Sequence, residues 1–299
     1  MITIRRILCP VDLSDTSLRA LQHAAALAGW YESSLTALYV DTTLPIENAD
    51  FAFAPPPALE VAGSSRALEE VRTFAGRASS VTKVAVAIEE STHVEGAILD
   101  AARSLPADLI VMGSHGRSGV PRLFLGSVAE RVVRSAPCPV MVVPPHDAVE
   151  PSTVSFKHIV CPVDFSDSSL AALTWALSLA EEADAQLSLL HVIEVPPELR
   201  VSAVVADPDL DQLHAAVEAD TLTRLRALIP VHASQYCSVE TATAAGAAGH
   251  AILEFAVSPH ADLIVMGAQG QGAVERLIFG SKTRDVVCGA TCPVLTVRR

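Results

Sequence analysis

The feature that most constrains the fold is a strand–loop–helix unit that occurs twice in the chain. The first copy, Ala107–Ser127, has an apolar run that ends at Gly113, a polar loop with Gly116, and Gly126 before a helical pattern. The second copy, Ala261–Ser281, repeats this order. In both copies two residues separate the first two glycines, nine separate the second from the third, and serine follows. The same local backbone is therefore expected at both places.

A second repeated stretch extends this duplication to nearly the whole chain. Residues 9–15 read CPVDLSD and residues 161–167 read CPVDFSD. Matched residues are 152 apart here and 154 apart at the glycine loops, so the two copies have almost the same length. We predict two domains, residues 1–146 and 147–299, separated within a linker, 144–155, that contains three prolines.

Strand and helix patterns alternate within each copy. Half of the residues are hydrophobic and only 4% are aromatic, which favours helices packed on a buried parallel sheet. The predicted class is α/β, with an open parallel sheet and helices on both faces in each domain. Expected strands are 7–11, 35–40, 82–88, the run before Gly113, and 140–143; expected helices start at Ser14 and span about 65–77, 94–104 and 127–135. Residues 41–65 show no helical period and are expected to form a lid, a binding loop or a partly disordered connection.

Ligands of such sheets bind at the carboxyl ends of the strands, where the winding direction reverses. Asp12 and Gly113 both follow strands, and Asp164 and Gly267 repeat this placement. If the two strands are neighbours, these stretches converge on one crevice in each domain.

The glycine loop suits an anion. Glycines allow positive φ and a close approach of the backbone, and the N–H groups at a helix start favour negative charge. The hydroxyl of Ser127 or Ser281 could donate to a phosphate oxygen. The alternative is a capping box in which Ser127 pairs with Glu130, although Arg284 at the matching place does not support it in the second copy.

Two interpretations also stay open for Asp12 and Asp164. Either carboxylate could accept a hydrogen bond from an adenine amino group or a ribose hydroxyl. Either could instead be a turn or capping residue before the helix that follows.

Several classes of function are excluded or disfavoured. The formal charge is −13, from 21 Lys and Arg against 34 Asp and Glu, and no basic track predicts nucleic acid binding. No apolar run reaches membrane-spanning length, so we expect a soluble, cytoplasmic protein without a membrane partner. The six cysteines are interpreted as small core residues, and no metal site is predicted. His115 becomes Gln269 in the second copy, so no catalytic residue is predicted.

The CPVD stretches, the apolar strand ending at Val40, the G-x2-G-x9-G-S loops and the terminal CPVMVV together resemble the universal stress protein family in its ATP-binding branch. The chain resembles a tandem member with two such domains. The resemblance implies five parallel strands in the order 3-2-1-4-5, an adenine nucleotide alpha hydrolase-like fold, and ATP as cofactor, with or without Mg²⁺. It also implies an intramolecular pseudo-dimer of the two domains, with a further homodimer left open.

The same resemblance implies the binding residues. Adenine is expected near Asp12 and Val40, ribose near Gly113, and the phosphates near Gly116, Gly126, Ser127 and Val128. The second copy supplies Asp164, Val192, Gly267, Gly270, Gly280, Ser281 and Lys282. The first copy departs from the family by having Thr92 where Gly246 stands in the second, so the two loops there are expected to differ.

The function implied is that of an ATP-binding stress or signalling protein with slow or absent hydrolysis. The alternatives are an enzyme of the same fold superfamily that uses ATP, by nucleotidyl transfer or weak ATPase activity, and an interaction module without ligand. Two charge changes, Arg117 to Gln271 and Pro121 to Glu275, predict tighter triphosphate binding by the first copy, partly offset by Lys282. The apolar last strands, 140–143 and 294–297, are expected to pair the domains.

Overall fold

The chain forms two compact units, one built on Thr3–His146 and the other on Ser155–Arg299, called domain one and domain two below. The computed structural model describes residues 2–42, 57–79, 82–116, 125–145, 154–194, 208–231, 233, 236–258, 260–270 and 280–298. The boundary between residues 146 and 147 stays a prediction.

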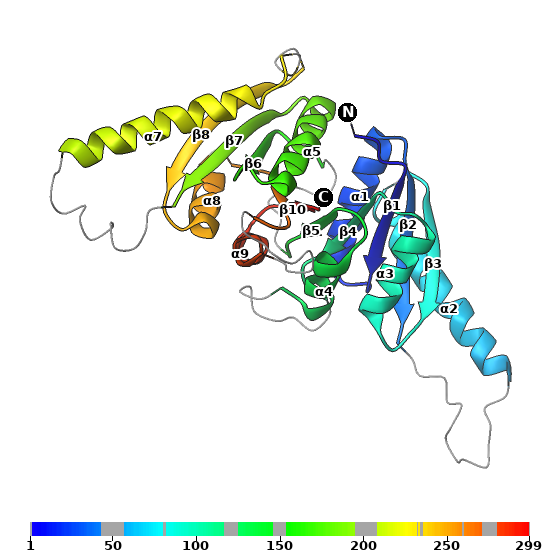
Figure 1. Ribbon diagram of the computed structural model, residues 1–299. Helices are drawn as coiled ribbons and strands as arrows, with labels where there is room; N and C mark the ends of the chain where they lie inside the picture. The colour runs from blue at the N-terminus through cyan, green and yellow to red at the C-terminus, as the bar shows by residue number, and fades with distance from the viewer. Residues whose placement is uncertain are drawn as a thin grey trace. The chain divides into compact units, whose positions relative to one another are not determined.

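Domain one alternates strands and helices. Its elements are β1 (Arg6–Val11), α1 (Asp15–Trp30), β2 (Ser34–Asp41), α2 (Pro57–Gly76), β3 (Val84–Glu90), α3 (Val94–Ser104), β4 (Leu109–Gly113), α4 (Ser127–Ser135) and β5 (Val140–Val143). The strands are parallel and lie in the order β3-β2-β1-β4-β5. Helices α1 and α2 pack together on one face of this sheet, and α3 and α4 pack together on the other (Figure 1).

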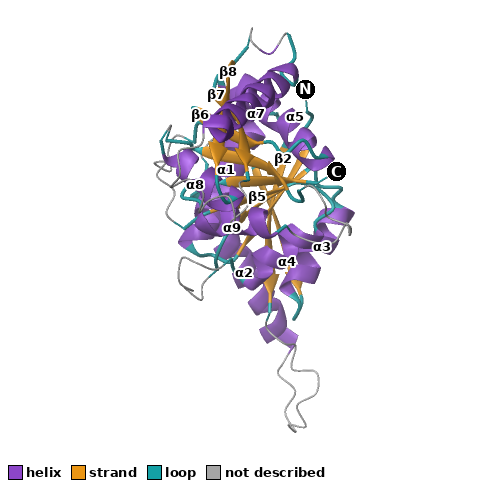
Figure 2. Ribbon diagram, turned by 60° about the vertical axis from the view of Figure 1, so that its left-hand side comes forward, coloured by secondary structure: helices purple, strands orange, loops and turns teal. Residues whose placement is uncertain are grey.

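Domain two repeats this architecture. Its elements are β6 (His158–Pro162), α5 (Asp167–Ala183), β7 (Gln186–Ile193), α7 (Pro208–Ala227), β8 (Ser238–Ala245), α8 (Ala248–Val257), β9 (Leu263–Gly267), α9 (Ser281–Gly289) and β10 (Val294–Val297). The strands are parallel in the order β8-β7-β6-β9-β10, and Figure 2 shows the strands lying between helices. The predicted fold class and the strand order 3-2-1-4-5 are confirmed in both domains.

Helices on both faces explain why the central strands are apolar at consecutive positions. Ile110 and Val111 of β4, and Ile264 and Val265 of β9, are all fully buried. Cys9 lies among such residues in β1, and burial raises the pKa of its thiol far above the usual range. A thiol held in this neutral form packs as a small apolar side chain and is a poor nucleophile.

An aspartate before β4 fixes that strand beside β1. The carboxylate of Asp108 accepts hydrogen bonds from the backbone N–H groups of Arg5 and Arg6, both at 2.9 Å. In domain two, Asp262 accepts from Lys157 at 2.6 Å and from His158 at 3.2 Å. Burial raises the pKa of Asp262, while these N–H groups act in the opposite direction. Because β1 lies beside β4 and β6 lies beside β9, the winding direction of each sheet reverses between these two strands. This place is the topological switch point of the domain.

One helix begins earlier than the sequence pattern indicates. Residues 41–65 were expected to lack helix, but α2 begins at Pro57. Proline fits the first helical position because its missing N–H has no partner there in any case. Alanine, leucine and glutamate follow, and all three favour a helix. The expected lid or binding loop thus falls on residues 43–56, outside the described residues.

The loops before α3 and α8 differ as expected. Gly246 has a φ of +137°, a conformation that side chains rarely adopt, whereas Thr92 in domain one does not have a positive φ. The backbone of the turn before α3 therefore differs from that of the turn before α8.

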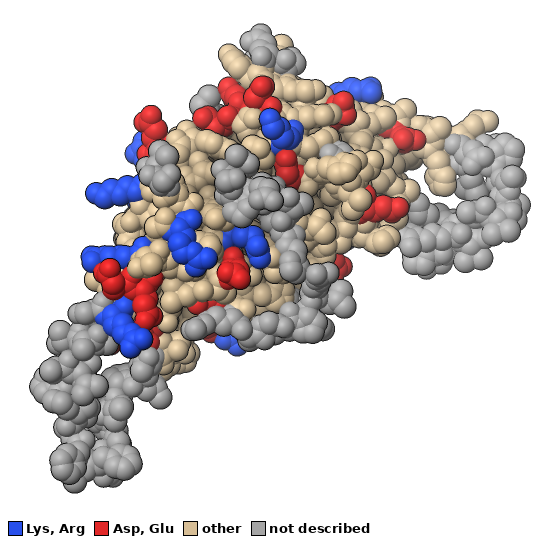
Figure 3. Space-filling view, turned by 180° about the vertical axis from the view of Figure 1, so that it is seen from behind, with Lys and Arg blue, Asp and Glu red and all other residues tan. Residues whose placement is uncertain are grey.

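Two surface properties bear on possible partners. On the face shown in Figure 3, the Lys and Arg side chains of the described residues lie beside Asp and Glu side chains and form no continuous basic track. None of the helices in the described ranges is both long and apolar enough to span a bilayer.

Candidate functional site

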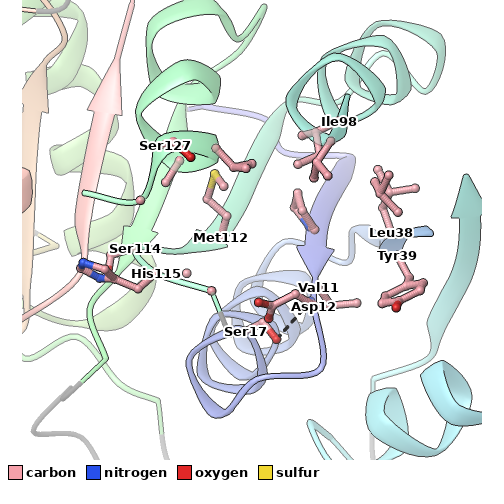
Figure 4. A pocket seen from close by; sticks show the side chains of 18 of the residues that line it. Val11, Asp12, Ser17, Leu38, Tyr39, Ile98, Met112, Ser114, His115 and Ser127 are labelled. Atoms are coloured by element: carbon pink, nitrogen blue, oxygen red, sulfur yellow. Dashed lines mark hydrogen bonds between the residues drawn. The ribbon is translucent and has the colours of Figure 1, made fainter. Parts of the chain in front are cut away.

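Each domain has a cavity at its switch point. The cavity of domain one has a volume of about 290 Å³ and lies between the β1–α1 loop, the end of β2, α3, and the stretch from β4 to α4 (Figure 4). All seven residues predicted for the first binding site line it: Asp12, Val40, Gly113, Gly116, Gly126, Ser127 and Val128. The structure thus brings together residues that are far apart in the sequence. Their role toward a ligand stays a prediction.

The carboxylate of Asp12 shapes the turn between β1 and α1. Its Oδ1 atom accepts hydrogen bonds from the backbone N–H of Ser14 at 3.1 Å and from the Ser14 hydroxyl at 2.5 Å. The Ser14 hydroxyl in turn accepts from the N–H of Ser17 and caps α1. Leu13, between Asp12 and Ser14, has a φ of 65°. This left-handed conformation is unfavourable for residues other than glycine. Asp12 is therefore a turn residue, as one of its two interpretations predicted.

The second oxygen of Asp12 explains why Gly116 has no side chain. A Cβ atom on Gly116 would lie 2.6 Å from Asp12 Oδ2, which is closer than atoms can pack. The loop after β4 therefore approaches this carboxylate closely at the mouth of the cavity.

Domain two repeats this turn. Asp164 Oδ1 accepts from the N–H of Ser166 at 3.0 Å and from its hydroxyl at 2.5 Å. Phe165 has a φ of 62°, and a Cβ atom on Gly270 would lie 2.9 Å from Asp164 Oδ2. The left-handed conformation is thus found at the same place in both copies. Backbone strain of this kind is typical of functional sites.

The helix that faces each cavity begins at a glycine. The N-cap residues are Gly126 for α4 and Gly280 for α9, and no side chain among the described residues caps either helix. The capping-box interpretation of Ser127 is therefore wrong, since Ser127 is the first residue inside the helix. Glu130 forms an ion pair with Arg134 at 3.0 Å instead. Without a capping side chain, the first turn can offer its N–H groups to an anion.

The expected positive φ at these glycines is wrong. Gly126 has a φ of −58° and Gly280 a φ of −62°, which any residue can adopt. Gly126 instead packs closely on the strand end, where its N–H donates to Ser114 O at 2.9 Å. A Cβ atom there would lie 3.0 Å from the same oxygen. Close approach, not backbone handedness, explains the glycine.

The cavity of domain two is larger and carries more charge. Its volume is about 700 Å³, and it is lined by all seven residues predicted for the second site: Asp164, Val192, Gly267, Gly270, Gly280, Ser281 and Lys282. Glu194 and Arg224 also line it. The ammonium group of Lys282 forms an ion pair with Glu194 at 2.6 Å. The cation expected to help with phosphates thus already has an anionic partner in the protein.

An aromatic group completes this cavity. The Arg224 guanidinium lies 3.9 Å from the centre of the Phe165 ring, and the rings of Phe165 and His191 are 5.0 Å apart. His191 Nδ1 lies 2.7 Å from Val163 O, which holds the imidazole in place. The residues predicted from the sequence did not include Phe165, His191, Arg224 or Glu194. Adjacency to Asp164 was the one sequence signal that pointed to Phe165.

Three further points concern His115, the residues expected to make the two sites unequal, and metal binding. His115 lines the cavity of domain one, and its Nδ1 atom is 3.0 Å from the hydroxyl of Ser114. The residues expected to make the two sites unequal lie outside the described residues: Arg117, Pro121, Gln271 and Glu275. Among described residues, no group of three or more His, Cys, Asp and Glu side chains could hold a metal ion.

Comparison with known proteins gives a consistent result for both halves. The model of the universal stress protein family matches residues 3–144 and again 155–298. A universal stress protein of Methanocaldococcus jannaschii is 32% identical over 145 residues, which is 48% of this chain and 83% of that protein. One of Mycobacterium tuberculosis strain H37Rv is 26% identical over 265 residues, covering 86% of this chain and 87% of the other. The crystal structure of a universal stress protein from Archaeoglobus fulgidus has the same fold, with a TM-score of 0.69 and 23% identity over 98% of both chains.

Proposed function

This chain belongs to the universal stress protein family, and on that premise we propose that both of its domains bind ATP in the cavities at their switch points. The observation that carries the proposal is the uncapped helix N-terminus, at Gly126 and at Gly280, that faces a cavity at the carboxyl ends of parallel strands. Such a helix start favours a phosphate through its N–H groups and its dipole.

The proposed arrangement of the nucleotide follows the resemblance drawn from the sequence. In domain one, adenine lies near Asp12 and Val40, ribose near Gly113, and the phosphates near Gly116 and the first turn of α4 from Gly126 to Val128. The position of Asp12 supports this arrangement, because Asp12 lines the same cavity as Gly116 and Val40. Any Mg²⁺ would enter with the nucleotide, held chiefly by its phosphates.

Domain two is proposed to bind the same class of ligand through its matched residues. Adenine lies near Asp164 and Val192, ribose near Gly267, and the phosphates near Gly270 and the first turn of α9 from Gly280 to Lys282. A cavity of about 700 Å³ is within the range that holds ligands of this size.

We propose that the output of nucleotide binding is a change of conformation or partner in a stress response, with slow or absent hydrolysis. His115 in domain one is matched by Gln269 in domain two, so the two cavities share no acid–base side chain at that position. Equal roles for the two cavities are therefore easier to reconcile with binding than with catalysis.

The test is to look for nucleotide in the full-length protein as purified. Mass spectrometry of the denatured protein should detect ATP, and calorimetry of nucleotide-free protein should show binding at two sites. Incubation with ATP should release little ADP. Fast release of more than one ADP per site would favour an ATP-using enzyme. If neither ATP nor adenosine binds, an interaction module without ligand is favoured.

We also propose that the two domains pair as an internal pseudo-dimer through β5 and β10. Both strands come last in their own domain's sheet, and both are almost entirely apolar. An apolar terminal strand left uncovered invites pairing with another strand. Each half expressed alone should then dimerise, and monodisperse, soluble monomeric halves would contradict the proposal.

A further inference from the structure

We propose that Glu194 acts as an internal anion that competes with the phosphates of the nucleotide for Lys282. Domain two then discriminates against ligands with many phosphates. This inference rests on the proposed function, since it concerns which nucleotides the second cavity prefers. It starts from an ion pair that has no counterpart in domain one.

The position of the ion pair carries the argument. Lys282 is the second residue of α9, directly after the uncapped start of that helix, and Glu194 follows the end of β7. Both line the same cavity, and their charged atoms are 2.6 Å apart. A contact this short is a charge-assisted hydrogen bond. The cation in the first turn of this helix is therefore already paired with an anion of the protein itself.

A phosphate that uses Lys282 must displace Glu194 and then lie near its carboxylate. The Lys282 side chain is 56% exposed and that of Glu194 49%, so solvent weakens both the attraction and the repulsion. The cost is thus modest, and it grows with the charge of the ligand. Adenosine carries no phosphate, so it does not compete with Glu194 for Lys282.

Domain one provides an internal comparison. The residues that match Lys282 and Glu194 are Val128 and Thr42, and both line the first cavity. Neither of them is charged. The start of α4 therefore faces its cavity without a competing carboxylate at this place, although the backbone around it has the same arrangement.

The experiment uses the full chain with domain one disabled by Gly126→Val. Binding of ATP, AMP and adenosine is measured by calorimetry before and after Glu194→Gln, which removes the charge and keeps the shape. We expect ATP affinity to rise about two- to five-fold, AMP affinity to rise less, and adenosine affinity to stay unchanged. The gain should shrink as salt is raised. Glu240→Gln, on the exposed edge strand β8 and outside the cavity lining, is the matched control.

A double-mutant cycle separates competition for Lys282 from simple repulsion. If Glu194 acts by holding Lys282, its replacement should matter less in a Lys282→Met background. Should the Gly126→Val chain not fold, the same series is measured in the otherwise unmodified chain by a two-site fit. Equal gains for ATP and adenosine, no gain, or the same gain in the control would overturn this inference alone. Absence of any nucleotide binding would overturn the proposed function as well.

Discussion

The two cavities share a backbone and differ in the side chains at their mouths. In both, an aspartate fixes a turn with a left-handed residue after it, and a helix starts at an uncapped glycine. Domain one then places threonine and valine at the positions where domain two has Glu194 and Lys282. Domain two adds Arg224 stacked on Phe165, and its cavity is larger, about 700 Å³ against 290 Å³.

Duplication kept the backbone arrangement that we propose for phosphate binding and changed the side chains beside it, which we expect to set the ligand preference of each cavity. Backbone groups depend on the fold, so they persist as long as the strand and helix ends keep their positions. Side chains at the mouth can change without disturbing the sheet. We therefore expect two sites that bind related ligands with different preferences.

The largest expected effect comes from blocking the start of the helix. Gly280→Val should weaken ATP binding in domain two by about 100-fold or more, which is about 2.7 kcal/mol. The reason is that the side chain would stand where the phosphates are proposed to lie. The variant should fold, because the nearest atom to a Cβ there is Thr283 Oγ1 at 3.4 Å and the backbone suits valine. Calorimetry with ATP measures the loss.

Gly126→Val should have the same effect on binding in domain one, together with a loss of stability. Its Cβ would lie 3.0 Å from a backbone oxygen, that of Ser114, so the strand end must shift. Undiminished ATP affinity in the double variant, Gly126→Val with Gly280→Val, would show that the glycine loops do not hold phosphates.

The next effect concerns how closely a helix packs on the strand end. Gly267→Ala should destabilise domain two by about 2 kcal/mol, because a Cβ there would lie 2.9 Å from backbone atoms of Ser168 and Ser169. Gly113→Ala should cost domain one about 1 kcal/mol, since the shortest contact, 2.9 Å, is with the Thr16 side chain. Differential scanning calorimetry of each full-length variant compares the two losses.

If Gly113→Ala lowers the stability more than Gly267→Ala does, the prediction is wrong and α1 packs more tightly on β4 than α5 packs on β9. Equal losses would mean that side-chain and backbone contacts constrain the two domains alike. The unmodified chain and Gly76→Ala serve as controls, since a Cβ on Gly76 meets nothing within 4 Å.

A smaller effect is the expected inequality of the two sites. Domain one should bind ATP several-fold more tightly, because Lys282 in domain two is already paired with Glu194. Adenosine should show a smaller difference, and the ATP difference should shrink at high salt. Titrations of the Gly280→Val and Gly126→Val chains isolate each site. Equal ATP affinities at low salt would contradict the prediction.

The smallest effect separates the two domains by pH. Glu95 at the start of α3 forms an ion pair with Arg131 of α4, whereas Gly249 and Asp285 occupy these positions in domain two. A backbone hydrogen bond in the first turn of the helix and then Arg131 lower the pKa of Glu95 below its ordinary value of 4.5. A lowered folded-state pKa means that the stabilisation is present above pH 4.5 and is lost as the pH falls through the folded-state value.

The Glu95→Gln variant should therefore be slightly less stable than the unmodified chain at pH 6, and the difference should vanish under acid conditions. Thermal melts of both chains across this range measure it. Since domain two has glycine at this place, its own transition should not change. A difference that persists unchanged in acid would rule out the ionised carboxylate as the cause.

Local sequence patterns predicted several elements to the residue. Helices 94–104 and 127–135 and the strand 140–143 have the predicted bounds, because the apolar period and the flanking polar residues agree there. The pattern was wrong for α2, which begins at Pro57 rather than near residue 65. Local chemistry explains the earlier start, because proline fits the first helical position and the alanine, leucine and glutamate that follow it favour a helix.

The sequence by itself determined the duplication, the fold class and the placement of the Asp12 and Gly113 stretches, with Asp164 and Gly267, at the carboxyl ends of strands. These follow from local spacing and from rules of parallel sheets that hold for any chain with such a pattern. Only the tertiary structure decided which atoms meet. It made Gly126 the helix cap instead of Ser127, replaced positive φ by close packing as the reason for that glycine, and gave Lys282 a partner in Glu194. Such contacts join residues far apart in the chain, and their energies depend on distances that no local pattern contains.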